Sequence, residues 1–106
     1  MTGVYLRFYV HEFRKHHGIL LYEWLLERAK EMGIHGGSAF RAIAGYGRHG
    51  VMHEAHFYDL AADLPVVVEF LVSDEKAEHL FALLKREQLQ VFFQRTPAEF
   101  GITGDG

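Results

Sequence analysis

A glycine-rich stretch at residues 45–50 is the first part of the sequence that could do chemistry. Its letters, GYGRHG, match the G-x-G-x-x-G pattern with which dinucleotide-binding folds bring backbone N–H groups against a pyrophosphate. That use needs a helix after the glycines, and the following VMHEAHFYDL lacks the apolar spacing of a helix. The sequence therefore argues against a Rossmann site. Two interpretations stay open: a glycine-rich hairpin loop, or a nest of backbone N–H groups that binds an anion beside Arg48 and His49.

The segment RKHHG, residues 14–18, is a second candidate because it joins an expected strand to an expected helix. Lys15 and His17 supply cationic side chains there, and the free N–H groups at the start of a helix favour an anion. Gly18 ends the segment. A solvated turn that caps the helix explains the same residues equally well, so both interpretations stay open.

The chain has eight histidines and no cysteine. Disulfides, thiolate catalysis and cysteine-ligated zinc are thus excluded. His49, His53 and His56 raise a metal hypothesis, but on a strand His56 would point away from the other two, so we predict no metal site there. No nucleophile elbow or catalytic constellation is apparent, and we predict that the protein is not an enzyme.

Composition limits the other classes of function. The 106 residues form one domain, and a net charge of −3 without a basic stripe gives little support for binding nucleic acid. No apolar run approaches the roughly 20 residues of a membrane-spanning helix, so membrane insertion is not expected. The absence of cysteine fits a reducing cytoplasm, which is the expected location.

Hydrophobic periodicity predicts four strands and two helices within a single domain at residues 1–96, followed by a flexible tail at 97–106. In chain order we expect a strand at 4–10, a helix at 19–32 closed by Gly33, strands at 38–46 and 66–72, a helix opened by Ser73, and a strand at 89–95. This β-α-β-β-α-β order predicts a ferredoxin-like α+β fold, with an antiparallel sheet and both helices on one face.

The other face of that sheet is not polar enough for water. Tyr5, Tyr9, Ile43 and Leu71, or their alternates along the strands, would lie on it. They are interleaved with charged groups that could form an ion pair such as Arg41–Glu69. A sheet with two apolar faces must be covered twice, and in so short a chain the second cover must be another subunit. We therefore predict an obligate oligomer.

Three stretches, HHGILLYE, GIHGGSAFRAIAGYG and DLPVVVEF, resemble in order and spacing the PII-like family known as domain of unknown function 190. The resemblance covers roughly residues 3–96. It implies a homotrimer with the sheets facing inward and an adenine nucleotide bound in the clefts between subunits. It also implies a regulatory role in signalling, with a membrane transport protein or channel as the regulated partner.

The resemblance also implies roles for particular residues. The PII motif at the base of the long T-loop matches Gly45, Tyr46, Gly47, Arg48 and His49, and we expect Lys15, His17 and Gly18 to join them in ligand binding. The T-loop counterpart is residues 48–64, whose partner-contacting side chains would be Met52, His53, His56, Phe57 and Tyr58.

Departures from the PII pattern change the expected ligand. His49 replaces a glutamine, and the segment after the second helix lacks the glycine- and lysine-bearing phosphate loop. The basic C-terminal residues of PII have no clear match apart from Arg95. Less phosphate support favours a monophosphate such as AMP, or a cyclic nucleotide, over ATP. The alternative functions are divalent-metal binding or tolerance, resembling trimeric CutA-type proteins and resting on the histidines, and a scaffold without a ligand.

Overall fold

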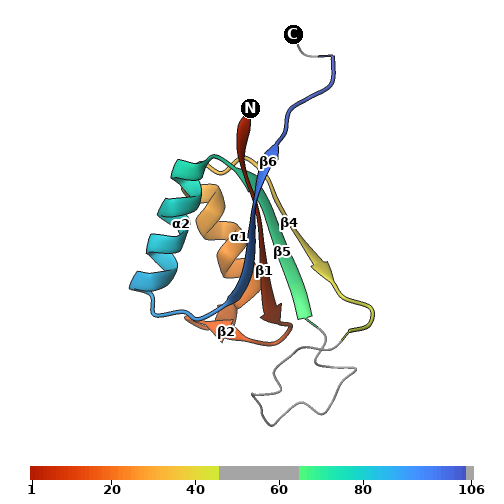
Figure 1. Ribbon diagram of the computed structural model, residues 1–106. Coiled ribbons are helices and arrows are strands. Elements are labelled where there is room, and N and C mark those ends of the chain that lie inside the picture. The colour runs from red at the N-terminus through yellow and green to blue at the C-terminus, as the bar shows by residue number, and fades with distance from the viewer. Residues whose placement is uncertain (46–64, 105–106) are drawn as a thin grey trace.

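The computed structural model describes residues 1–45 and 65–104 of the chain. These residues form one mixed sheet-and-helix unit with a short hairpin attached (Figure 1). In chain order the elements are β1 (Thr2–His11), β2 (Lys15–His16), β3 (Ile19–Leu20), α1 (Leu21–Glu31), β4 (Gly37–Arg41), β5 (Pro65–Val72), α2 (Asp74–Arg86) and β6 (Phe92–Glu99).

The main sheet has four strands in the order β4-β5-β1-β6, and every neighbouring pair is antiparallel. Both helices lie on the same side of this sheet in Figure 1. This arrangement is the predicted ferredoxin-like fold, which is thereby confirmed.

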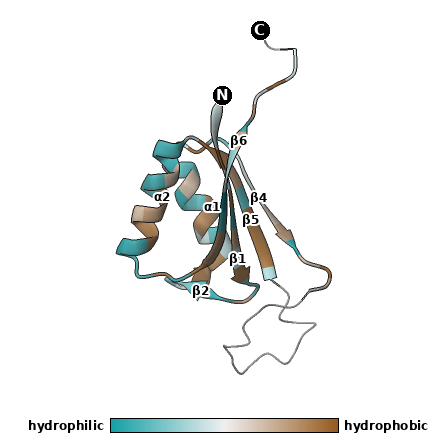
Figure 2. Ribbon diagram, in the orientation of Figure 1, coloured by the Kyte–Doolittle hydropathy of each residue, from teal (hydrophilic) through white to brown (hydrophobic). Residues whose placement is uncertain are grey.

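The face of the sheet beneath the helices holds the core. Alternate residues of β1 (Val4, Leu6, Phe8 and Val10) are at most 4 % exposed, and the alternate residues of β5 opposite them are equally buried. Figure 2 shows both strands as largely apolar, whereas the helices carry polar residues on their outer sides. Phe8 sits at the centre, with its ring centroid 6.3 Å from that of Phe70 and 5.8 Å from that of Phe81.

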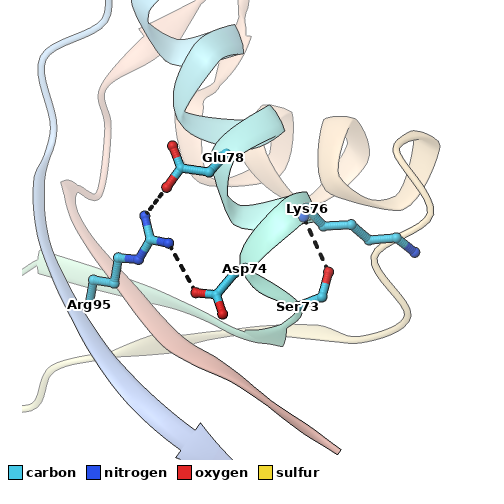
Figure 3. Close-up of polar contacts among 5 residues, drawn as sticks. All are labelled: Ser73, Asp74, Lys76, Glu78 and Arg95. Carbon is cyan, nitrogen blue, oxygen red and sulfur yellow. Dashed lines mark hydrogen bonds and ion pairs between the residues drawn. The ribbon is translucent and has the colours of Figure 1, made fainter.

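Both predicted helix boundaries that rest on local chemistry are confirmed. Gly33 follows α1 with a φ of +85°, a conformation that glycine adopts without strain. Ser73 precedes α2, and its Oγ accepts a hydrogen bond from the backbone N–H of Lys76 at 3.2 Å (Figure 3). Asp74 and Glu75 then occupy the first turn, where the helix dipole favours negative charge.

Two strands differ from the predicted ones by three residues or more at their ends, and one of these differences is that β6 begins at Phe92 instead of residue 89. β4 ends at Arg41, five residues before the predicted end at residue 46, and Ala42 then donates a backbone hydrogen bond to the carbonyl of Pro65. β6 continues to Glu99, so Pro97, Ala98 and Glu99 of the predicted tail belong to the sheet, where they pair with the first residues of β1.

The open face of the sheet carries large side chains with no cover from the described chain. Phe40 is 54 % exposed, Leu71 47 % and Phe92 65 %. The predicted position of Ile43 on this face is wrong, since Ile43 lies beyond the end of β4; it is nonetheless almost fully exposed.

The predicted ion pair between Arg41 and Glu69 is also wrong. Arg41 pairs in register with Val66 and so shares the parity of the covered face, where its guanidinium contacts Glu12. Glu69 is instead opposite Arg7, whose Nε lies 3.2 Å from the Glu69 carboxylate. Tyr5 donates a hydrogen bond of 2.6 Å to the same carboxylate, which raises the pKa of the Tyr5 hydroxyl. A charge of each sign thus sits at the centre of the open face.

Candidate ligand-binding site

Three chain connections meet at one end of the main sheet, where strands begin and end. This end is called the hairpin edge, because the β2–β3 hairpin lies there. β1 ends there at His11, which pairs with Pro65 at the start of β5, and β4 ends beside them at Arg41. In Figure 1 this edge also carries β2, and it lies at the opposite end of the molecule from the N and C termini. The connection after β1, the connection after β4 and the connection after α2 are therefore gathered in one place.

Polar contacts fasten these connections to one another. Arg41 at the end of β4 pairs with Glu12 just after β1. Arg14, also after β1, donates from its guanidinium to the carbonyl of Gln90 in the α2–β6 connection at 2.8 Å, and burial lowers the pKa of Arg14. Side-chain contacts between residues far apart in the chain therefore stabilise this end of the sheet.

The segment predicted as a polar loop at residues 14–18 forms a tight hairpin. Lys15 pairs with Leu20 and His16 with Ile19, leaving His17 and Gly18 as the two turn residues. Their φ values are +52° and +83°, and two consecutive positive φ values are what a type I′ turn requires. Strands of two residues are too short to give a periodic signal, which is why the sequence pattern did not reveal them.

The structure brings three of the predicted ligand residues together in this hairpin: Lys15, His17 and Gly18. Gly45 is described as well, four residues after the end of β4. Tyr46, Gly47, Arg48 and His49 of the predicted ligand site, and the predicted partner residues Met52, His53, His56, Phe57 and Tyr58, lie outside the described residues.

Two further residues at the hairpin, His16 and Glu87, were not predicted from the sequence. His16 Nε2 lies 2.8 Å from Oε1 of Glu87, and His17 Nε2 lies 2.9 Å from the same oxygen. These two hydrogen bonds lower the pKa of the Glu87 carboxyl, and the one from His16 has the larger effect. The consecutive histidines were a visible signal, but a glutamate 71 positions from His16 could be assigned to them only by the fold.

Glu87 is positioned by the way α2 ends. Gln88 donates to the carbonyl of Lys85, and Leu89 donates to the carbonyl of Leu84, which is the hydrogen-bond pattern of a Schellman motif. Gln88 holds the left-handed position of that motif with a φ of +57°, where glycine is usual. The motif turns the chain away from the helix and leaves the Glu87 side chain directed at the hairpin.

Besides its hydrogen bond to Glu87, His16 packs against Trp24 of α1. The two ring centroids are 4.8 Å apart, with the planes nearly perpendicular, and Trp24 is buried. The side chain of His16 is 16 % exposed and that of His17 is 66 % exposed. One imidazole of the pair is therefore fixed against the core, and the other is open to solvent.

Arg95, the one counterpart suggested for the basic C-terminal residues of PII, faces α2. Its guanidinium donates to Glu78 at 2.7 Å and to Asp74 at 3.3 Å (Figure 3). The hydrogen bond with Glu78 is the main reason why the pKa of Arg95 is raised. In this structure its charge is neutralised by two helix carboxylates, away from the hairpin edge.

Two solved proteins share this fold. The structure of CPII from Thiomonas intermedia K12, bound to ADP, AMP and acetate, superposes with a TM-score of 0.65 at 14 % identity, covering 95 % of this chain and 90 % of CPII. A protein described as PII-like from Thermus thermophilus superposes with a TM-score of 0.61 at 20 % identity, covering 92 % and 88 %. At these identities the similarity shows a common fold.

The sequence identifies the family itself. Residues 3–92 match the profile of DUF190, described as "Uncharacterized ACR, COG1993", and the chain belongs to that family. The UPF0166 protein of Aquifex aeolicus is 40 % identical over 80 residues, which is 76 % of either chain. A UPF0166 protein of Methanocaldococcus jannaschii is 32 % identical over 79 residues, covering 74 % of this chain and 72 % of the relative. The resemblance noted in the sequence is thereby confirmed.

Neither helix in residues 1–45 and 65–104 has the length and apolar character needed to cross a bilayer.

Proposed function

We propose that this protein is a PII-like regulatory subunit that binds an adenine nucleotide, with AMP preferred, between copies of itself in a homotrimer. The observation that carries the proposal is the gathering of three connections at the hairpin edge, directly before the glycine motif that begins at Gly45. The similarity in fold to CPII, whose structure holds ADP and AMP, supports an adenine nucleotide as the ligand class.

The open face of the sheet supports the homotrimer. Its exposed apolar side chains lie on three different strands, β4, β5 and β6, and so form a broad surface instead of scattered single residues. The Arg7–Glu69 pair at its centre is self-neutralising, so burial of this face does not leave a lone charge. Packing this face of each copy toward the others would bring the hairpin edges to the boundaries between subunits.

The charge of the hairpin edge supports a monophosphate ligand. Arg14 is already engaged with a carbonyl group, and the carboxylate of Glu87 lies against the hairpin, directly after the last turn of α2 that carries Lys85 and Arg86. Lys15 is exposed at the edge and accessible to a phosphate. Each added phosphate would bring negative charge toward Glu87, so affinity should fall from AMP to ATP.

The regulatory output would be carried by residues 48–64. A nucleotide at the base of this loop would change the population of loop conformations that bind a partner, and we propose a membrane transport protein as that partner. Regulation through a loop needs no catalytic group, which is consistent with a non-enzymatic role in the cytoplasm.

Calorimetric titration with AMP, ADP, ATP and cyclic AMP tests the ligand. We expect AMP to bind at least about tenfold more tightly than ATP, a difference of roughly 1.4 kcal/mol. Gly47→Val should abolish binding while the trimer persists, because the proposed nest of backbone N–H groups depends on the conformational freedom of glycine, which a β-branched residue lacks. Gly36→Val is the matched control, since a Cβ at Gly36 would meet no atom within 4 Å. Absence of heat with all four nucleotides at millimolar concentration would refute the proposal.

The alternative function, metal tolerance through His53 and His56, concerns residues outside the described ranges. Equilibrium dialysis of a His53/His56 double variant with Zn²⁺, Cu²⁺ and Ni²⁺ tests it. Metal tolerance through these residues requires sub-micromolar affinity that the double substitution removes.

A further inference from the structure

We propose that His16, His17 and Glu87 form a binding site for a divalent transition-metal ion, with Zn²⁺ as the reference ligand. The proposal rests neither on nucleotide binding, although His17 is also a predicted nucleotide ligand, nor on the histidines in the 48–64 loop. It rests on three side chains from two distant parts of the chain that direct their metal-ligating atoms at one point.

The geometry of the three groups is close to that of a zinc site. One ligand atom from each of the three residues lies within 4.8 Å of the other two. Both histidine Nε2 atoms are within 2.9 Å of the same carboxylate oxygen. In a tetrahedral site with zinc–ligand bonds of about 2.0–2.1 Å, neighbouring ligand atoms are about 3.3 Å apart. The two imidazole–carboxylate distances therefore need to grow by about half an ångström. The remaining separation, which lies within 4.8 Å, must shorten toward the same value, and rotation of the exposed His17 side chain can supply both changes.

The chemistry of the donor set selects the metal. Two imidazoles and one carboxylate suit Zn²⁺, Ni²⁺ and Cu²⁺, whereas Mg²⁺ and Ca²⁺ prefer sites made of oxygen ligands alone. Without a metal, a carboxylate can only accept, so both Nε2 atoms carry a proton in this structure. On binding, each ring releases its Nε2 proton to solvent and presents that lone pair to the ion, and a ring that was neutral takes up a proton from solvent on Nδ1.

The surroundings hold the ligands in place before any ion arrives. Trp24 fixes the ring of His16, and the Arg14–Gln90 hydrogen bond fastens the hairpin to the segment that carries Glu87. Within the described ranges, the two non-glycine residues with positive φ are His17, a proposed ligand, and Gln88, the neighbour of Glu87. Such conformations persist where the surrounding structure imposes them, and they concentrate at functional sites.

Three protein ligands leave one tetrahedral position open. Catalytic zinc sites keep such a position for water or substrate, whereas structural sites close it with a fourth side chain. Because the side chain of His17 is largely exposed, the open position would face solvent at the hairpin edge. A water molecule or an oxygen atom of a small ligand could occupy it.

Trp24 provides a direct readout, because it is the single tryptophan of the chain and its ring contacts that of His16. Titration of the full chain with Cu²⁺ or Ni²⁺, without nucleotide, should quench the Trp24 fluorescence to saturation at one ion per chain. Zn²⁺ should compete with that quenching and should bind with the same stoichiometry in calorimetry. Mg²⁺ at the same concentration should do neither.

Substitutions distinguish this site from other histidines. Glu87→Gln keeps the size of the side chain but removes its charge, and His17→Asn introduces a residue that tolerates positive φ. Each should weaken Zn²⁺ binding by at least about tenfold, since loss of even a hydrogen-bond partner behind a metal ligand costs that much. His79→Asn on the exposed surface of α2 is the matched control and should leave the affinity unchanged.

Two results would overturn the proposal. One is the absence of saturable Zn²⁺ binding by the intact protein; the other is binding that Glu87→Gln and His17→Asn leave unchanged while the His53/His56 double variant loses it. Circular dichroism of each variant checks that its fold persists. Because no nucleotide is present, neither result bears on the proposed AMP site.

Discussion

The two faces of the main sheet are formed by the same strands, but their apolar side chains differ in burial. Beneath the helices, Phe8 and its alternate neighbours in β1 are nearly inaccessible to solvent, and the chain covers them itself. On the open face, Phe92 and Leu71 remain exposed, and a Tyr5–Glu69–Arg7 cluster lies among them. Strand propensity is therefore common to both faces. What differs is that the helices bury one face as the core of the chain, while the other face stays available for contact with another subunit.

The largest difference between the faces should appear on truncating one phenylalanine of each. Phe8→Ala should lower the free energy of unfolding by about 3–5 kcal/mol, because it leaves a cavity among the Phe70 and Phe81 rings. Phe92→Ala should cost much less in a dissociated chain, since Phe92 is already 65 % exposed there. Urea unfolding of both variants measures the contrast. Equal losses at low protein concentration would show that the open face is packed within a single chain.

A charge placed on the open face should act on assembly and spare the fold. Leu71→Asp should dissociate the proposed trimer, because an unpaired buried carboxylate costs several kcal/mol or more. Its far-UV circular dichroism should remain that of the folded chain, since Leu71 is 47 % exposed. Sedimentation velocity gives the oligomeric state. Ile102→Asp, at a residue beyond β6 that is 78 % exposed, is the control and should remain assembled. A trimeric Leu71→Asp protein would place the subunit interface elsewhere.

The smallest expected effect is the alkaline titration of the open face. The hydrogen bond to Glu69 raises the pKa of Tyr5 above its ordinary value of 10.0, so the folded chain resists losing this proton. The corresponding stability is fully present below pH 10 and is lost as the pH rises through the folded-state pKa. Ultraviolet titration of the wild type against Tyr5→Phe isolates this phenol. Glu69→Gln should bring its pKa back toward 10.0. An unchanged Tyr5 titration in Glu69→Gln would mean that another group raises the pKa.

Much of the fold could be predicted because its signals are local. Alternation in β1, the cap at Ser73 and the glycine after α1 each depend on a few consecutive residues. The wrong predictions concern features that depend on which strands and side chains pair with each other. Arg41 shares a face with the core and pairs with Glu12, a register that no pattern within residues 38–46 reveals. The β2–β3 hairpin was missed because its strands are only two residues long.

The candidate site divides in the same way. Lys15, His17 and Gly18 could be selected from the sequence, since charge and a glycine beside a helix start are local features. His16 was passed over, although it is the better fixed of the two histidines through its contact with Trp24. Glu87 became part of the site only when the Schellman turn after α2 was brought against the hairpin by the sheet.

By itself, then, the sequence determined the order of the main strands and helices, the family, and the presence of two apolar faces on one sheet. These properties follow from periodicity, capping and side-chain chemistry, which act over a few neighbouring residues. The tertiary structure alone decided that Arg7 and not Arg41 faces Glu69, and that two histidines share one glutamate oxygen. The physical reason is that strand register and chain crossing bring together residues separated by 62 to 71 positions, and local interactions along the chain do not specify these contacts.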